Sequence, residues 1–211
     1  MELAELVSKL ESRLKLPLPG ALAHEPIRAI PAGGIAPNFE HKLPPKPGSV
    51  LILLYPEDGR IKFPLTKRQT YAGAHSDQVS LPGGKTEQGE IYIDTALREA
   101  EEEIGVDRSQ VSVVGALSNF FVIPSNFMIV PVIAYSPVKP IFKPDPFEVA
   151  RIITGDLQDL ISDDAVKEKE ILAAGKYRMN AHYFDIENEI VWGATAMILN
   201  EFRLILREFI K

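Results

Sequence analysis

Residues 84–106 read GKTEQGEIYIDTALREAEEEIGV, and this stretch decides the fold. Apolar residues recur in it at the spacing of one helical face, which predicts an amphipathic helix over residues 91–104 that ends at Gly105. We expect that face to pack on a core. Its residues are Ile93, Ala96, Leu97, Ala100 and Ile104.

Glutamates occupy a second face of the predicted helix. Glu99, Glu102 and Glu103 fall on one arc at about 100° per residue, whereas Glu101 points elsewhere. Like charges at these spacings destabilise an isolated helix by a few tenths of a kcal/mol per pair. The glutamates alone fit a solvated acidic face as well as an oxygen-rich site for Mg²⁺ or Mn²⁺.

The residues around these glutamates form a longer pattern. Five residues separate Gly84 from Glu90, and seven more separate Glu90 from Arg98. The rest of the pattern is Arg98-Glu99, an apolar Ala100, Glu102-Glu103 after one residue, then Gly105 and an apolar Val106 after one more. The stretch resembles the Nudix box, the signature of the Nudix hydrolases, at every fixed position. The resemblance implies an α/β/α sandwich with a mixed β-sheet.

Nudix enzymes hold divalent cations against the diphosphate of a nucleotide derivative, so the resemblance implies Mg²⁺ or Mn²⁺ here. It implies Glu99 and Glu103 as the principal metal ligands, with Glu102 and the backbone carbonyl of Gly84 contributing. A diphosphate reacts slowly until its oxygens are neutralised, which agrees with that reading. The resemblance also implies catalytic or positioning roles for Glu90, Arg98, Glu99 and Glu102, with Glu90 and Arg98 tying the loop to the helix.

The segment before the box resembles the extended motif of the coenzyme A diphosphatase subgroup. The matching stretches are Leu65-Thr-Lys-Arg68, Gly73-Ala-His-Ser76, Gln78-Val-Ser80 and Leu81-Pro-Gly-Gly84. Leu81 replaces the usual Phe, Asp77 replaces a common Gly, and Gly73 stands where many members have a second Arg. The resemblance implies hydrolysis of coenzyme A or acyl-CoA to 4′-phosphopantetheine and adenosine 3′,5′-bisphosphate.

Candidate substrate contacts lie in and beyond this motif. Lys67 and Arg68 are phosphate contacts or solvated strand-end charges, and Phe127 is a stacking platform or a core residue. Glu148 is a distal general base or a surface charge. The full set of predicted contacts is Lys67, Arg68, His75, Ser76 and Phe127.

Two other functions stay open. One is a different Nudix pyrophosphatase, acting on ADP-ribose or in nucleotide housecleaning. The other is a non-catalytic Nudix-fold sensor that binds a nucleotide. An intact glutamate set weighs against the sensor, because a binding protein has no need of like charges on one helix face.

Composition limits the partners and the compartment. The chain of 211 residues is 45% hydrophobic, enough for a real core. Its net charge of −6 gives no global attraction to nucleic acid or anionic membranes, and it lacks cysteine for disulfides or thiolate chemistry. The first residues are charged throughout, unlike a signal peptide. We expect a cytoplasmic protein that binds a small molecule and neither nucleic acid nor membrane, with a homodimer left open.

The chain divides into an N-terminal segment, residues 1–46, and a Nudix domain, residues 47–211. A helix is predicted from Leu3, Leu6, Val7, Leu10 and Leu14, and eight prolines between residues 17 and 47 predict irregular structure after it. We expect that segment to pack on the domain, because its polar stretches are interrupted by Leu22, Ile27, Ile30, Ile35 and Phe39.

The rest of the chain mixes strands and helices, which predicts an α/β fold with a mixed sheet. We expect a hairpin at 49–66, a loop at 67–84, strands at 111–117 and 128–135, and a loop at 139–147. Further on we expect a strand or turn leading into a short helix at 147–160, a hairpin at 183–192 and a helix at 193–210.

Overall fold

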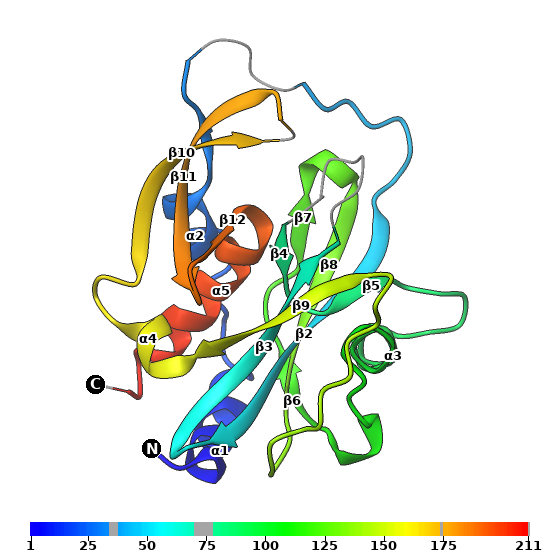
Figure 1. Cartoon of the computed structure of the whole chain (residues 1–211), viewed down its shortest axis with the longest axis vertical. Coiled ribbons are helices and arrows are strands. Elements are labelled where there is room, and N and C mark those ends of the chain that lie inside the picture. Colours follow the sequence, from blue (N-terminus) through cyan, green and yellow to red (C-terminus); the bar gives the residue numbers. More distant parts are fainter. Residues whose placement is uncertain (34–37, 70–77, 174, 211) are drawn as a thin grey trace.

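The computed structural model describes residues 1–33, 38–69, 78–173 and 175–210. Within them, a large mixed sheet lies between layers of helices (Figure 1), which confirms the α/β prediction. Its strand order is β4-β3-β2-β8-β6, with β5 beside β2, β7 beside β8 and β9 beside β3. The strands are β2 (Lys46–Glu57), β3 (Arg60–Arg68), β4 (Val79–Ser80), β5 (Gly83–Lys85), β6 (Ser112–Ala116), β7 (Phe120–Val122), β8 (Phe127–Tyr135) and β9 (Val149–Asp156).

Strand β2 forms the centre of this sheet. It pairs parallel with β8, from Lys46 opposite Phe127 to Leu54 opposite Tyr135, and antiparallel with β3 and β5. Its run of apolar residues is buried on both faces, as expected for a strand covered by helices on two sides. Leu51 and Leu53 pack on α3 (Tyr92–Ile104), while Ile52 and Leu54 join the opposite core.

Helix α3 forms one outer layer, and its predicted apolar face meets the sheet. Ala96, Ala100 and Ile104 are buried there, and Ile93 and Leu97 pack at the edge of the same cluster. The opposite layer contains α1 (Leu3–Arg13), α4 (Leu157–Ile161) and α5 (Gly193–Leu206), as Figure 1 shows. Helix α3 packs against β2 and β5, and the Gly-Gly turn, which consists of Gly83 and Gly84, lies at the start of β5.

A smaller sheet packs against α5. It has the order β1-β11-β10, with β12 beside β11. Its strands are β1 (Ile30–Pro31), β10 (Val166–Ala173), β11 (Tyr177–Ile186) and β12 (Glu189–Trp192). The hairpin predicted at 183–192 is confirmed as the β11–β12 pair, joined by a turn at Glu187 and Asn188, both with positive φ.

The N-terminal segment contributes to the main core. Leu6 and Leu10 of α1 are fully buried with residues of β2, β3 and α5. Short helices α2 (Ala21–His24) and η1 (Glu25–Ile27) interrupt the proline-rich stretch, where we expected none. Of its apolar residues named above, Ile27 is buried, whereas Leu22, Ile30 and Phe39 are exposed and Ile35 lies outside the described residues. The many prolines in this stretch argue against helical structure, but α2 is short enough to lie between two of them.

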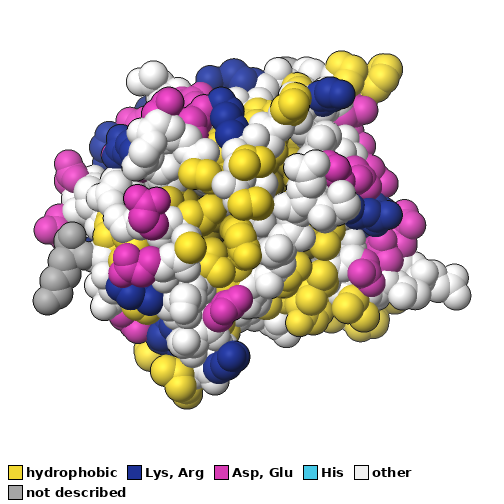
Figure 2. Space-filling model, turned by 90° about the horizontal axis from the view of Figure 1, so that it is seen from below, with side chains coloured by type: hydrophobic (Ala, Val, Ile, Leu, Met, Phe, Trp, Pro, Cys, Tyr) yellow, Lys and Arg dark blue, Asp and Glu magenta, His cyan; other side chains and the backbone are white. Residues whose placement is uncertain are grey.

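Other element boundaries also differ from expectation. Strands β1, β7 and β10 were not predicted, and the loop expected at 67–84 contains β4 and the start of β5. Helix α5 ends at Leu206 rather than near residue 210. Among the described residues, no helix is long and apolar enough to cross a membrane. The face seen in Figure 2 carries hydrophobic side chains with acidic and basic groups interspersed around them, so no single sign of charge covers that face.

Candidate active site

The Gly-Gly turn brings β5 close to both β2 and α3. A Cβ on Gly83 would lie 2.3 Å from the Ser49 carbonyl oxygen, so only glycine fits against β2 there. A Cβ on Gly84 would lie 2.4 Å from a carboxylate oxygen of Glu99. The two glycines therefore allow the Glu99 carboxylate to lie directly against the backbone of β5.

Both ends of helix α3 are fixed. At its start the Ile91 N–H donates to the Asp94 carboxylate, and at its end Gly105 adopts the left-handed conformation with φ of 69°. The chain after β8 then returns to this end, because the N–H groups of Lys143 and Asp145 donate to the carbonyls of Ile104 and Glu103. The helix is thus held rigidly beside the turn.

Arg98 lies at the centre of the carboxylate face. Its Nε donates to Glu90 Oε1 at 2.6 Å, and its Nη1 donates to Glu99 Oε1 and Glu102 Oε2, each at 2.9 Å. Its Nη2 donates to Glu90 Oε2 and to the Lys85 carbonyl at 3.1 Å. The pair that the Nudix resemblance implied between Glu90 and Arg98 is therefore present, and it joins the loop to the helix.

The electrostatics of this pair are strong. Hydrogen bonds from Arg98, together with the Glu87 N–H and Thr95 hydroxyl, lower the pKa of Glu90 to about 2. The hydrogen bonds that Arg98 donates to Glu90, Glu99 and Glu102 raise the pKa of its guanidinium. Both groups are charged at neutral pH, as a positioning pair requires. Sequence reasoning missed Thr95, whose hydroxyl donates to Glu90 at 3.0 Å. The only signal for it in the sequence is a threonine one helical turn before Arg98.

Glu103 is the least exposed of the three glutamates, at 5%. Its Oε2 accepts the Gly83 N–H at 3.1 Å, a contact that sequence reasoning also missed. Burial raises the pKa of Glu103 to about 7, with Glu99 and Glu148 adding repulsion, while the Gly83 N–H and Arg68 oppose the rise. Burial likewise raises the pKa of Glu99, against the opposing effect of Arg98. Burial therefore makes both carboxylates costly to ionise in the absence of a bound cation.

Glu102 and Glu101, which precede Glu103 in the chain, are more exposed. The Glu102 side chain is 60% exposed and extends to Arg98. Glu101 lies on a different side of the helix, with its carboxylate 3.4 Å from Arg108. This arrangement matches the helical-wheel prediction that Glu101 points away from the cluster.

The donor set suits a hard divalent cation, because it consists of carboxylates and a backbone carbonyl. The fit is supported by Glu99 lying against Gly84 and by the raised pKa of both Glu99 and Glu103. Within the described ranges no three acidic or histidine side chains already form a metal-binding group, and Arg98 contacts Glu99 and Glu102. A cation would take over part of the charge balance that Arg98 now supplies.

The predicted substrate contacts do not all reach this face. Arg68 is half-buried at the end of β3, and its positive charge lies close enough to Glu103 to lower the pKa of the Glu103 carboxylate. Lys67 instead extends to β12, where its ammonium lies 3.0 Å and 3.1 Å from the two Glu189 oxygens. The register of β3 against β9 shifts between Lys67 and Arg68, and of the two only Arg68 is among the charges that act on Glu103.

The remaining candidates are placed only in part. Phe127 is half-buried at the start of β8, with the Lys46 ammonium 5.4 Å from its ring centre. A Cβ on Gly48 would lie 3.1 Å from the Phe127 ring and 2.7 Å from the Gly84 carbonyl oxygen, so the ring is near the turn. His75 and Ser76 lie outside the described residues.

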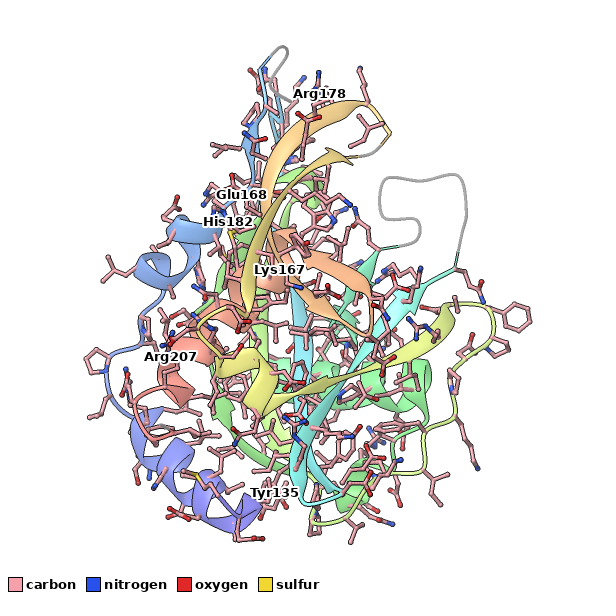
Figure 3. All side chains as sticks on the ribbon, turned by 60° about the vertical axis from the view of Figure 1, so that its left-hand side comes forward. Tyr135, Lys167, Glu168, Arg178, His182 and Arg207 are labelled. Atoms are coloured by element: carbon pink, nitrogen blue, oxygen red, sulfur yellow. The ribbon has the colours of Figure 1, made fainter. Side chains whose placement is uncertain are left out.

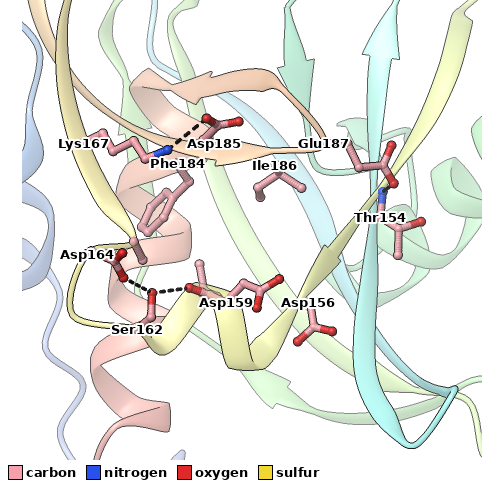
Figure 4. Close-up of a pocket in the computed structure, with 12 residues that line it drawn as sticks. Thr154, Asp156, Asp159, Ser162, Asp164, Lys167, Phe184, Asp185, Ile186 and Glu187 are labelled. Atoms are coloured by element: carbon pink, nitrogen blue, oxygen red, sulfur yellow. Dashed lines mark hydrogen bonds and ion pairs between the residues drawn. The ribbon is translucent and has the colours of Figure 1, made fainter.

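A separate hollow of about 340 Å³ lies between β9, α4 and the smaller sheet (Figure 4). Its lining is acidic, but the carboxylates have partners of their own. Asp156 and Asp159 contact Arg60, Asp185 contacts Lys167, and Glu187 accepts the Thr154 N–H. None of the predicted site residues lines it, and the box remains the candidate active site.

Comparison with known proteins shows to which family this chain belongs. The model of the NUDIX domain matches residues 45–174, more than half of the chain. The chain belongs to the Nudix family. Nudix hydrolase 15, mitochondrial, of Arabidopsis thaliana is 39% identical over 164 residues, which cover 74% of this chain and 56% of the relative. An uncharacterised Nudix hydrolase NudL of Yersinia pestis is 32% identical, covering 64% of this chain and 67% of its own.

The fold agrees with this Nudix assignment. The crystal structure of RenU, a Nudix hydrolase from M. smegmatis, superposes with a TM-score of 0.57. It is 16% identical and covers 80% of this chain and 90% of that one. The chain spans little more than half the length of the Arabidopsis relatives, at 56% and 53%. The matches therefore establish the family and the fold.

Proposed function

We propose that this Nudix chain hydrolyses the diphosphate bond of a nucleoside diphosphate derivative, with coenzyme A or acyl-CoA as its substrate. The products would be 4′-phosphopantetheine and adenosine 3′,5′-bisphosphate. The observation that carries the proposal is the pair of poorly exposed carboxylates, Glu99 against Gly84 and Glu103 against Gly83, which are costly to ionise without a cation.

The proposal gives each box residue a role. Glu99, Glu103 and the Gly84 carbonyl would hold Mg²⁺ or Mn²⁺, with Glu102 assisting from the more exposed part of the same face. When bound, the cation supplies neutralisation of the diphosphate oxygens and polarisation of water. Arg98 and Glu90 hold the turn and the helix in register, and Arg98 keeps Glu99 and Glu102 on one side of α3.

The coenzyme A part of the proposal is supported by the sequence before the box and by Arg68. An otherwise acidic site needs a local cation to attract a substrate with an additional phosphate. Arg68 is such a cation near Glu103, whereas Lys67 is paired with Glu189. A charge-assisted contact of this kind favours a phosphorylated substrate by roughly tenfold or more.

The test is a substrate panel assayed with Mg²⁺ and with Mn²⁺, including CoA, acetyl-CoA, dephospho-CoA, ADP-ribose, NADH and dinucleoside polyphosphates. We expect CoA to be cleaved with a kcat/KM about tenfold above that of dephospho-CoA. Arg68→Ala should abolish this preference, and Lys67→Ala should leave it unchanged. Equal rates on both substrates in the wild type would refute the CoA assignment and leave a general Nudix pyrophosphatase.

A further inference from the structure

The chain between β8 and β9 forms a turn that is anchored beside the carboxylate face. Asp145 Oδ1 accepts the N–H groups of Phe147 and Glu148 at 2.7 Å and 3.1 Å, which fixes the turn internally. The Asp145 N–H also donates to the Glu103 carbonyl at 2.9 Å. The turn is therefore attached to the last turn of α3, next to the proposed metal ligands.

A second anchor comes from the end of β3. The Gln69 side-chain amide donates to the Pro146 carbonyl at 2.9 Å, and the Gln69 N–H donates to the Glu148 carbonyl at 3.2 Å. The turn thus has hydrogen bonds to two elements that border the site. Glu148 lies close enough to Glu99 and Glu103 to repel both carboxylates.

Phe147 lies at the tip of this anchored turn, and its side chain is highly exposed in the part of the chain that the structure describes. The residue is 87% exposed, the largest fraction among the exposed large hydrophobic residues of the described chain. A single exposed apolar side chain needs no explanation by itself. Here five hydrogen bonds hold the turn, and the carboxylate of the next residue, Glu148, is close enough to act on both Glu99 and Glu103.

We propose that Phe147 is the platform on which the nucleobase of the substrate stacks. A flat base needs only one ring face and leaves its polar edges in water, where the carboxylate of Glu148 can accept its N–H groups. An acyl chain would need a continuous apolar groove instead, and the neighbours of Phe147 are an exposed proline and two acidic residues. The proposal rests on the proposed function, because the base must belong to a nucleotide whose phosphates reach the carboxylate face.

The first experiment measures KM and kcat for CoA with Mg²⁺ in the wild type, Phe147→Ala and Phe147→Trp. Loss of base stacking should raise KM about tenfold in Phe147→Ala with kcat nearly unchanged, and Phe147→Trp should restore KM. Ile141→Ala is the matched control, because Ile141 is an 81% exposed apolar residue of the same chain segment and lies outside the anchored turn. A Phe147→Ala KM equal to that of the control would overturn the proposal while leaving the hydrolase assignment intact.

A binding measurement keeps the two proposals separable. Tryptophan fluorescence of Phe147→Trp is titrated with AMP and with ribose 5-phosphate in the presence of Mg²⁺, since neither probe contains a diphosphate. The wild type, whose single tryptophan is Trp192, gives the baseline. We expect AMP alone to quench the added tryptophan, even if no diphosphate in the substrate panel is cleaved. Equal responses to both probes would overturn the stacking role whatever the activity.

Discussion

At the residue scale, the surroundings of Glu103 favour a neutral side chain, whereas its proposed role as a metal ligand needs a charged one. Its carboxylate is nearly buried and accepts a backbone N–H from Gly83, yet it faces two further carboxylates, Glu99 and Glu148. Burial and repulsion favour the protonated form, whereas a bound cation would favour the charged form. Glu103 is therefore placed favourably for binding a cation, and this placement lowers the stability of the metal-free protein.

This conflict predicts opposite effects of Glu103→Gln on activity and stability. Turnover should fall by roughly a hundredfold or more, because a proposed metal ligand loses its charge. The melting temperature without metal should stay the same or rise, because repulsion is relieved. Paired assays of kcat/KM and metal-free melting would measure both. Glu101→Gln is the control with little expected effect on either, and full activity in Glu103→Gln would exclude the ligand role.

The raised pKa of Glu103 also predicts a pH dependence of stability. The folded protein holds this proton up to about pH 7, whereas the unfolded chain releases it near 4.5. The stability that protonation supplies is therefore complete below about pH 4.5 and lost as pH rises to about 7, by roughly 2 to 4 kcal/mol. Urea unfolding of metal-free wild type and Glu103→Gln between pH 4.5 and 8 would measure the difference. Parallel pH curves for the two proteins would contradict the prediction.

At the scale of elements, the contact between β5 and α3 depends on Gly84. A Cβ there would meet the free end of the Glu99 side chain rather than backbone, so the side chain can move aside. Gly84→Ala should therefore cost little stability but displace a proposed metal ligand, lowering kcat/KM by about tenfold to a hundredfold. Gly83→Ala is the contrasting variant, because its Cβ would meet the Ser49 carbonyl and should destabilise the fold. Comparable melting losses in both variants would count against this assignment.

The sequence predicts α3 and its surroundings well because the signals there are local. Helical periodicity identifies the buried face of α3, and Gly105 marks its end in the expected left-handed conformation. The direction of Lys67 could not be predicted in this way. It depends on Glu189, which is distant in sequence and joins β3 only in the folded chain. His75 and Ser76 remain predictions.

Strand β10 escaped prediction for a related reason. Its residues 167–170 alternate Lys, Glu, Lys and Glu, so neither face has the apolar residues that normally identify a strand. It is nevertheless paired along its length with β11, including Glu168 opposite His182, which lie side by side in Figure 3. At the other side β10 is the edge of the smaller sheet. The charged residues that make the strand hard to predict also oppose pairing of this edge with another chain.

The alternation predicts that β10 does not pair with a second copy. Two-fold antiparallel pairing places residues of the same face opposite one another, so Lys167 and Lys169 meet lysines and Glu168 and Glu170 meet glutamates. Replacing Glu168 and Lys169 together by Thr should remove most of this repulsion and produce association that grows with concentration. Sedimentation velocity would detect it. A wild-type dimer that cross-links through β10 would disprove the prediction.

At the scale of the whole molecule, a buried cluster joins the N-terminal segment to the C-terminal helix. Glu201 of α5 is fully buried, and its carboxylate contacts His24 Nε2 at 2.9 Å, the Gly20 N–H at 3.0 Å and the Ser118 hydroxyl at 2.6 Å. Burial alone would raise the pKa of Glu201, but these hydrogen bonds hold it below its usual value. The carboxylate of Glu201 therefore joins three parts of the chain that are distant in sequence.

We predict that this cluster supports the fold without taking part in the chemistry. Removing one partner of a buried pair leaves an uncompensated charge, so His24→Ala should destabilise the protein by about 3 to 5 kcal/mol while kcat stays nearly constant. Ser118→Ala removes a neutral donor and should cost only about 1 kcal/mol. Because the pKa of Glu201 is lowered, its stabilisation is present above about pH 4.5 and lost as pH falls through the folded value. Urea unfolding of both variants at pH 7 and pH 4 would separate these effects, since the penalty of His24→Ala should shrink in acid. Equal penalties for the two variants at pH 7 would mean that the charge of Glu201 does not hold the N-terminal segment in place.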